Sequence, residues 1–231
     1  KTNFTASFIL KYLGLMGLMY VIWQINAPVA LILFLGYSAW HFGESDFREL
    51  NIEGNWKSFS WGLWLLVSIL TLHLTELNEF LPYFDLAKLP EGKPFLGFTT
   101  VKWAVFFSAF LMVFFTCIYQ SYSKLRDVVY IVILGTFMPL LVAFGLYFIG
   151  HHSINGWSHL KKGLNMTNNQ LWKKAWPFSL GAFFILSLFL GVVDWNKTAY
   201  WAQFFIFLSC ISFPHVWEMR KFYMKSKPVV S

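Results

Sequence analysis

The segment from Tyr147 to Lys162 reads YFIGHHSINGWSHLKK, and it joins the end of a long apolar run to a lysine pair. Three of the six histidines in the chain, His151, His152 and His159, lie in this segment. Ionisable side chains are costly inside a bilayer, and those that occur there are functional by default. The segment therefore predicts a functional site at the end of the apolar run, with walls supplied by the rest of the chain.

The composition of the 231 residues indicates an integral membrane protein. Only 13% of the residues are charged, about half of the roughly 25% that is usual in soluble domains, and the mean hydropathy is +0.54. We expect one membrane domain over residues 1–231. The net charge of +7 comes from cations in the loops between apolar runs. Such cations favour phospholipid headgroups as partners and give no reason to expect nucleic acid.

Seven apolar segments approach the length of about 20 residues that a spanning helix needs. They cover residues 8–25, 28–42, 59–74, 99–119, 128–152, 176–193 and 199–216. The segments are continuously apolar rather than alternating, which favours helices over the strands of a barrel. The predicted fold is an all-α, polytopic transmembrane bundle in the plasma membrane. The basic loop after residue 160 and the basic tail place the C-terminus in the cytoplasm.

A second candidate group surrounds His41 at the polar end of the second segment. Glu44 lies three residues later, so it shares a helical face with His41, and Asp46 follows closely. This spacing suits a metal-ligating histidine beside a carboxylate that binds the same ion or orients the imidazole ring. The alternative is a helix end that reaches the membrane interface, where all three side chains contact water.

The adjacent residues His151 and His152 point about 100° apart on a helix, so at most one of them faces a given site. His152, Asn155 and His159 share one face, but His152 and His159 are about 10 Å apart along a regular helix. Both would bind one ion only if the helix bends, for which the two flanking glycines are suitable. Alternatively, His159 marks the interfacial end of this helix.

The remaining histidines are His215 and His73. His215 follows Pro214, which frees a carbonyl one turn earlier in the helix. It is a candidate ligand, a partner that orients a ligand, or a capping group, whereas His73 is expected to be structural. Histidines from three separate segments provide the nitrogen donors that suit Fe, Zn or Cu. With few acids and no cysteine among them, they favour a redox-active iron with open coordination positions.

Three motifs occur in order along the chain: HFGESDF at 41–47, the His152-Ser153 pair after an apolar run, and Pro214-His215 near the C-terminus. They resemble the motifs of the Brp/Blh family of membrane β-carotene cleavage dioxygenases. The resemblance implies a non-haem Fe(II) enzyme that cleaves the central double bond of β-carotene with O₂. The products would be two molecules of all-trans-retinal, with a rhodopsin as the possible acceptor.

By this resemblance, His41 and His152 are iron ligands at the catalytic centre. The further candidate ligands are His151, His159 and His215, and the surrounding polar residues are Glu44, Asp46 and Asn155. The family has an earlier PHGxxD motif with no counterpart here, so we expect a further span before residue 1. The family also has a histidine four residues after the HS motif, where this chain has Gly156, and His159 is the nearest substitute.

The competing interpretation is a non-catalytic carotenoid- or lipid-binding membrane protein, or a transporter, with structural histidines. The seven segments show no paired halves, which disfavours a transporter. A carotenoid-cleaving enzyme would need an apolar tunnel, and six phenylalanines are candidates to line it. These are Phe107, Phe110, Phe114, Phe137, Phe144 and Phe148.

Overall fold

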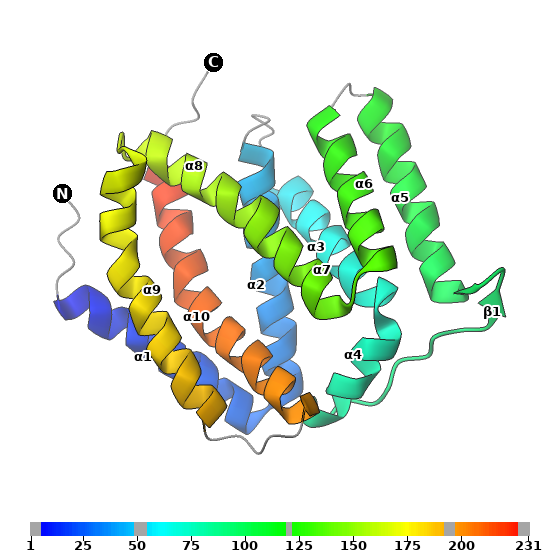
Figure 1. Ribbon diagram of the computed structural model, residues 1–231, viewed down its shortest axis with the longest axis horizontal. Helices are drawn as coiled ribbons and strands as arrows, with labels where there is room; N and C mark the ends of the chain where they lie inside the picture. Colours follow the sequence, from blue (N-terminus) through cyan, green and yellow to red (C-terminus); the bar gives the residue numbers. More distant parts are fainter. Residues whose placement is uncertain (1–5, 49–54, 119–121, 192–196, 226–231) are drawn as a thin grey trace.

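The computed structural model describes residues 6–48, 55–118, 122–191 and 197–225, and these residues are almost entirely helical (Figure 1). The predicted all-α class is confirmed. The helices are α1 (Ala6–Ile25), α2 (Ala27–Arg48), α3 (Asn55–Leu72), α4 (Leu74–Phe80), α5 (Thr100–Ile118), α6 (Tyr122–Phe137), α7 (Leu140–Tyr147), α8 (Ile154–Gly163), α9 (Asn168–Gly191) and α10 (Lys197–Lys225).

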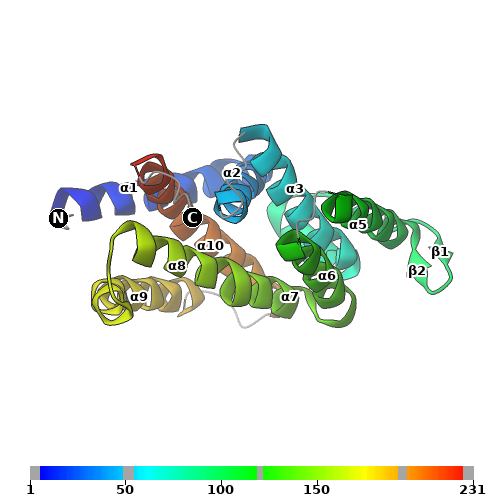
Figure 2. The same cartoon turned by 90° about the horizontal axis from the view of Figure 1, so that it is seen from above.

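Three shorter elements complete the described chain. A 3₁₀ turn, η1 (Leu81–Phe84), follows α4, and a π-helical turn, η2 (Phe148–Ser153), joins α7 to α8. The loop before α5 contains an antiparallel pair of two-residue strands, β1 (Pro94–Phe95) and β2 (Phe98–Thr99). Seen from above, α5 and α6 lie at one end of the elongated molecule and α1 and α9 at the other (Figure 2).

The expectation of one continuous helix over residues 128–152 is wrong. The helix ends at Phe137 and resumes at Leu140, with Pro139 in an extended conformation between them. Proline has no N–H to donate and disfavours helical geometry in the residue before it, so the break lies at this position. The new helix is capped by Glu76, whose Oε2 accepts a hydrogen bond from the Leu140 N–H at 2.9 Å.

A second break lies at the end of the third apolar segment, where the chain bends by 87° between α3 and α4. His73 lies at the bend, with Nδ1 2.6 Å from the Ile69 carbonyl oxygen and Nε2 2.8 Å from that of Met138. These contacts give His73 the structural role expected from the sequence. Among the described helices, only Ala6–Ile25 is long and apolar enough to cross a membrane as a single helix. The bent pair of α3 with α4 and η1 provides a second span if the pair is taken together as one span. Seven spans are therefore not confirmed.

Helix α2 lies between α3 and α10 (Figure 1). Two glycines allow α2 and α3 to approach closely. A Cβ atom at Gly43 would lie 1.7 Å from the Ser58 carbonyl oxygen, and one at Gly62 would lie 1.8 Å from that of Ala39. On the other side, the Tyr37 hydroxyl donates a 2.6 Å hydrogen bond to the Ser209 carbonyl of α10. These contacts fix α2, which carries His41, against both neighbours.

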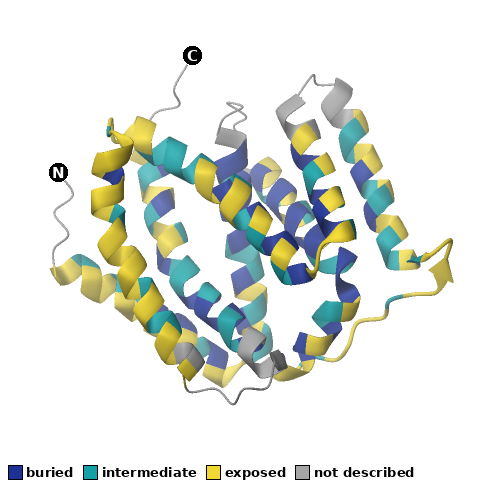
Figure 3. Ribbon diagram, viewed as in Figure 1, coloured by how far each residue is buried: buried dark blue, intermediate teal, exposed yellow. Residues whose placement is uncertain are grey.

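Burial follows this arrangement. The core includes the facing sides of α2, α3, α7 and α10 and buried residues of α1, whereas α9 is exposed along most of its length (Figure 3).

Candidate metal centre

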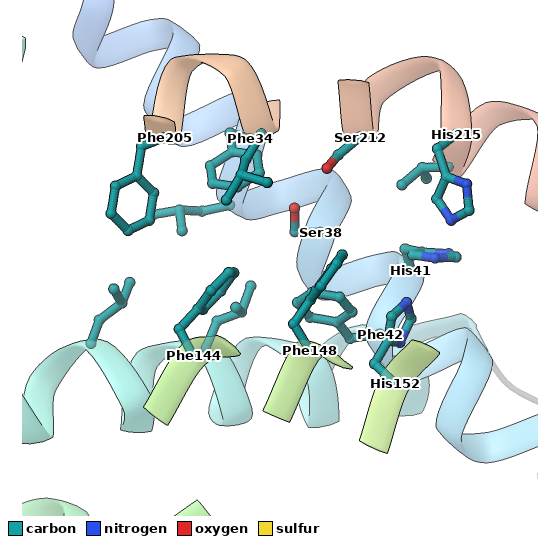
Figure 4. A pocket seen from close by; sticks show the side chains of 15 residues that line it. Phe34, Ser38, His41, Phe42, Phe144, Phe148, His152, Phe205, Ser212 and His215 are labelled. Carbon is teal, nitrogen blue, oxygen red and sulfur yellow. The ribbon is translucent and has the colours of Figure 1, made fainter. Parts of the chain in front are cut away.

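An elongated cavity lies between α2, α3, α10 and the α7–η2 segment (Figure 4). Its wall is largely aromatic and aliphatic, and includes Phe34, Phe144, Phe148 and Phe205. Three histidines lie together at one end of this cavity, and each comes from a different element (Figure 4). The cavity is therefore an apolar space that ends in a group of nitrogen donors.

The three histidines are His41 of α2, His152 of η2 and His215 of α10. The ring centroids of His41 and His152 are 4.9 Å apart, and those of His41 and His215 are 5.3 Å apart. His41 and His152 are buried, with exposed fractions of 3% and 5%, whereas His215 is exposed. The sequence placed these residues in three separate segments, and the fold brings them together.

Three buried ring nitrogens of this group, two on His41 and Nδ1 on His152, lack a hydrogen-bond partner within the described residues. A buried polar atom without a partner costs free energy, and each such case in a native protein needs an explanation. A metal ion bound by the imidazoles would use these lone pairs, and imidazole is a suitable ligand for iron. The residues present therefore fit a metal ion.

The position of His152 depends on the π-helical turn. In such a turn the backbone bonds run five residues back rather than four. The Ser153 hydroxyl follows the same spacing and donates to the Phe148 carbonyl at 2.8 Å. The helix departs from regular α-helical geometry around His152 itself, and His159 does not join the histidines of the cavity. Single π turns inside α-helices are frequent at functional sites.

His151 points to a different polar group, as expected for the neighbour of His152 on a helix. Its Nε2 lies 3.6 Å from Oδ1 of Asp46 and 3.7 Å from Oδ2 of Asp127. The Asn155 amide nitrogen lies 3.3 Å from the same atom. Both carboxylates are buried. Asp46 also accepts hydrogen bonds through Oδ2, from the Trp61 indole N–H at 2.8 Å and the Tyr147 hydroxyl at 3.5 Å.

Asp46, Asp127 and His151 thus form a second group that could hold a metal, since their ligand atoms lie within 4.8 Å of one another. The sequence reasoning included Asp46 and His151 but missed Asp127. The signal was an acidic residue directly before the apolar run that starts at Val128. Carboxylate-rich groups suit harder ions than an imidazole group does.

The other predicted site residues lie outside the cavity wall. Nδ1 of His159 is 3.3 Å from the Tyr223 hydroxyl of α10. Glu44 is half-buried one turn after His41. Of the phenylalanines expected to line a tunnel, Phe144 and Phe148 line the cavity. The other four candidates do not line it and are exposed: Phe107, Phe110, Phe114 and Phe137.

Comparison with known proteins adds one finding. No curated protein and no solved structure matches the chain. The model of one protein family, described as beta-carotene 15,15'-dioxygenase, matches residues 1–223. This match covers all of the histidines and both buried aspartates, and it agrees with the motifs at His41, His152 and His215. The chain belongs to the beta-carotene 15,15'-dioxygenase family.

Proposed function

We propose that this chain cleaves the central double bond of β-carotene with O₂ to give two molecules of all-trans-retinal. The metal would be Fe(II), held by His41, His152 and His215. The observation that carries the proposal is the group of buried imidazole nitrogens without hydrogen-bond partners at the end of an apolar cavity. The Asp46 group is the weaker candidate for the catalytic metal, because none of its three members lines this cavity.

The chain's own residues would bind and orient the substrate. An apolar wall excludes water and favours a long hydrocarbon over polar molecules. The rings of Phe144 and Phe148 are nearly parallel, with an interplanar angle of 11°, so they offer flat surfaces to a flat polyene. When bound, Fe(II) supplies the redox chemistry with O₂ that side chains alone lack. His41, His152 and His215 would hold the ion at the end of the cavity, next to the double bond of a bound substrate.

The location would be the plasma membrane, with several spans in the bilayer. The support comes from the composition and from large apolar side chains that are exposed on α1 and α9, such as Leu10, Ile25, Phe183 and Phe184. Many large apolar side chains exposed on the same helices are typical of surfaces that contact lipid or another protein. β-Carotene dissolves in the same bilayer, and the retinal formed there would be available to a rhodopsin.

Expression in a bacterium that makes β-carotene tests the proposal, with retinal and residual β-carotene measured by chromatography and iron measured per purified chain. We expect retinal to form and β-carotene to decrease. His41→Ala and His152→Ala should each reduce retinal at least about 100-fold, since loss of an outer-shell group alone costs 10–100-fold.

The matched control is Phe107→Ala, which truncates an exposed side chain on α5. Membrane levels of each variant, measured by immunoblot, separate loss of activity from loss of protein. Unchanged β-carotene in cells with sufficient iron and normal amounts of the wild-type protein would contradict the proposal. Iron-free protein that retains bound carotenoid would favour a binding protein instead.

A further inference from the structure

The two ends of the cavity are lined by different residue types, and three elements contribute to both ends. On α2, on α7–η2 and on α10, a phenylalanine of the cavity wall precedes a histidine in the chain. The pairs are Phe34 and His41, Phe144 and His152, and Phe205 and His215. Phe34, Phe144 and Phe205 lie toward one end of the cavity and the histidines at the other (Figure 4). The cavity therefore extends to one side of the histidines.

The two ends differ in access. At the phenylalanine end, the ring of Phe205 lies 6.1 Å from that of Phe144 and 6.2 Å from that of Phe80. All three side chains are buried, and Phe80 backs Phe205 from α4. At the other end, His215 is exposed. Among the described residues, Phe205 therefore closes one end of the cavity, and the end beside the histidines is exposed at His215.

The length of the cavity can be estimated from the helix. Phe205 and His215 are ten residues apart on α10, which corresponds to about 15 Å along an α-helix. An extended carbon chain advances about 1.2 Å per bond, so roughly twelve bonds fit into this length. That is about the distance in β-carotene from the central double bond to the far edge of the terminal ring.

We propose that this cavity measures one half of the carotenoid and thereby selects the bond that is cleaved. One terminal ring would rest against Phe205, the attached half of the polyene would fill the cavity, and the central double bond would lie at the histidines. The other half would leave through the open end beside His215. This inference rests on the proposed function and adds the determinant of cleavage position. The chemistry is balanced, because one C=C bond breaks and each of its carbons gains one oxygen atom of O₂.

The cavity has a volume of about 40 Å³, well below the roughly 300 Å³ at which the usual range of ligand pockets begins. The rings that line it, Phe144 and Phe148 among them, must rotate to admit a polyene. A narrow cavity accepts a flat chain more readily than a bulky one. It also leaves little room for the chain to slide, which is what a measuring site requires.

Changing the closed end should move the cleavage position. Phe205→Trp makes the cavity shorter, so fewer bonds fit between the end wall and the histidines. Phe205→Ala makes it longer. Each variant should give two unequal apocarotenals in place of a single product, retinal. Liquid chromatography with mass spectrometry identifies them, and Phe107→Ala, the exposed control, should give retinal alone.

A second measurement on the wild-type protein avoids any effect of the substitutions on folding. The substrate is an apocarotenal with one intact ring-bearing half and a shortened second half. We expect retinal and a short dialdehyde, because the position is counted from the intact ring. Cleavage at the middle of the shortened chain would overturn the inference.

The outcomes separate the two proposals. Retinal as the sole product of both Phe205 variants would reject the measuring role and leave the dioxygenase proposal intact. Absence of any cleavage product with the iron-loaded wild-type protein would reject the dioxygenase proposal itself.

Discussion

His151 and His152 are neighbours in the chain, yet their rings belong to two different polar groups. The sequence predicted that they point apart, because helical geometry separates adjacent side chains by about 100°. It could not assign each ring to a partner, since the assignment depends on the π-helical turn that contains them. That turn has no signature in the residue types alone. Asp127 was missed for a related reason: its partner, His151, is distant in the chain and is brought near only by the fold.

Asp46 provides a prediction at this scale. Asp46→Leu removes the acceptor of the Trp61 indole N–H and a carboxylate beside His151. We expect the free energy of unfolding to fall by about 1–3 kcal/mol, the usual cost of leaving a buried polar group without its partner. Asp46→Asn keeps an oxygen that accepts the indole N–H, so this variant should lose less of the free energy of unfolding. Thermal unfolding in detergent measures both, and equal stability of the Leu variant and wild type would count against this role.

At the scale of elements, the helical segments were predictable and their interruptions were not. Continuous apolar composition identified the regions that became α1, α2, α5, α9 and α10. The break at Pro139 lies inside a long apolar run, where hydropathy indicated a single span. The capping bond from Leu140 to Glu76 that stabilises the break comes from a residue 64 positions away. Such long-range partners decide where a helix ends, and local periodicity does not contain them.

The close packing of α2 and α3 provides the prediction at this scale. Gly43→Ala places a methyl group against the Ser58 carbonyl of α3, where no space exists. Overpacking of this kind costs about 1–3 kcal/mol and forces backbone shifts. These shifts would displace His41, which lies two residues before Gly43 on the same helix. We expect lower thermal stability and less retinal. Gly36→Ala is the matched control on the same helix, because a Cβ atom there meets no heavy atom within 4 Å. A Gly43 variant as stable and active as the Gly36 variant would contradict the packing argument.

For the whole molecule, the central feature is that α2, α10 and the α7–η2 segment carry their histidines to one end of a shared apolar cavity (Figure 4). The sequence predicted the all-α class and nominated five histidines for one site, of which His41, His152 and His215 line the cavity. The other two, His151 and His159, contact different partners. The sequence did not predict the one-sided shape of the cavity, because that shape depends on Phe80 and Phe205 meeting across α4 and α10. The fold also offers a second possible metal group, at Asp46, Asp127 and His151.

X-ray absorption spectroscopy at the iron edge, on purified protein loaded with Fe(II), distinguishes these two groups most directly. The account predicts an imidazole-rich ligand shell that loses one imidazole in His215→Ala and is unchanged in Asp127→Asn. A carboxylate-containing shell that changes in Asp127→Asn and not in His215→Ala would contradict it, and would assign the iron to the aspartate group.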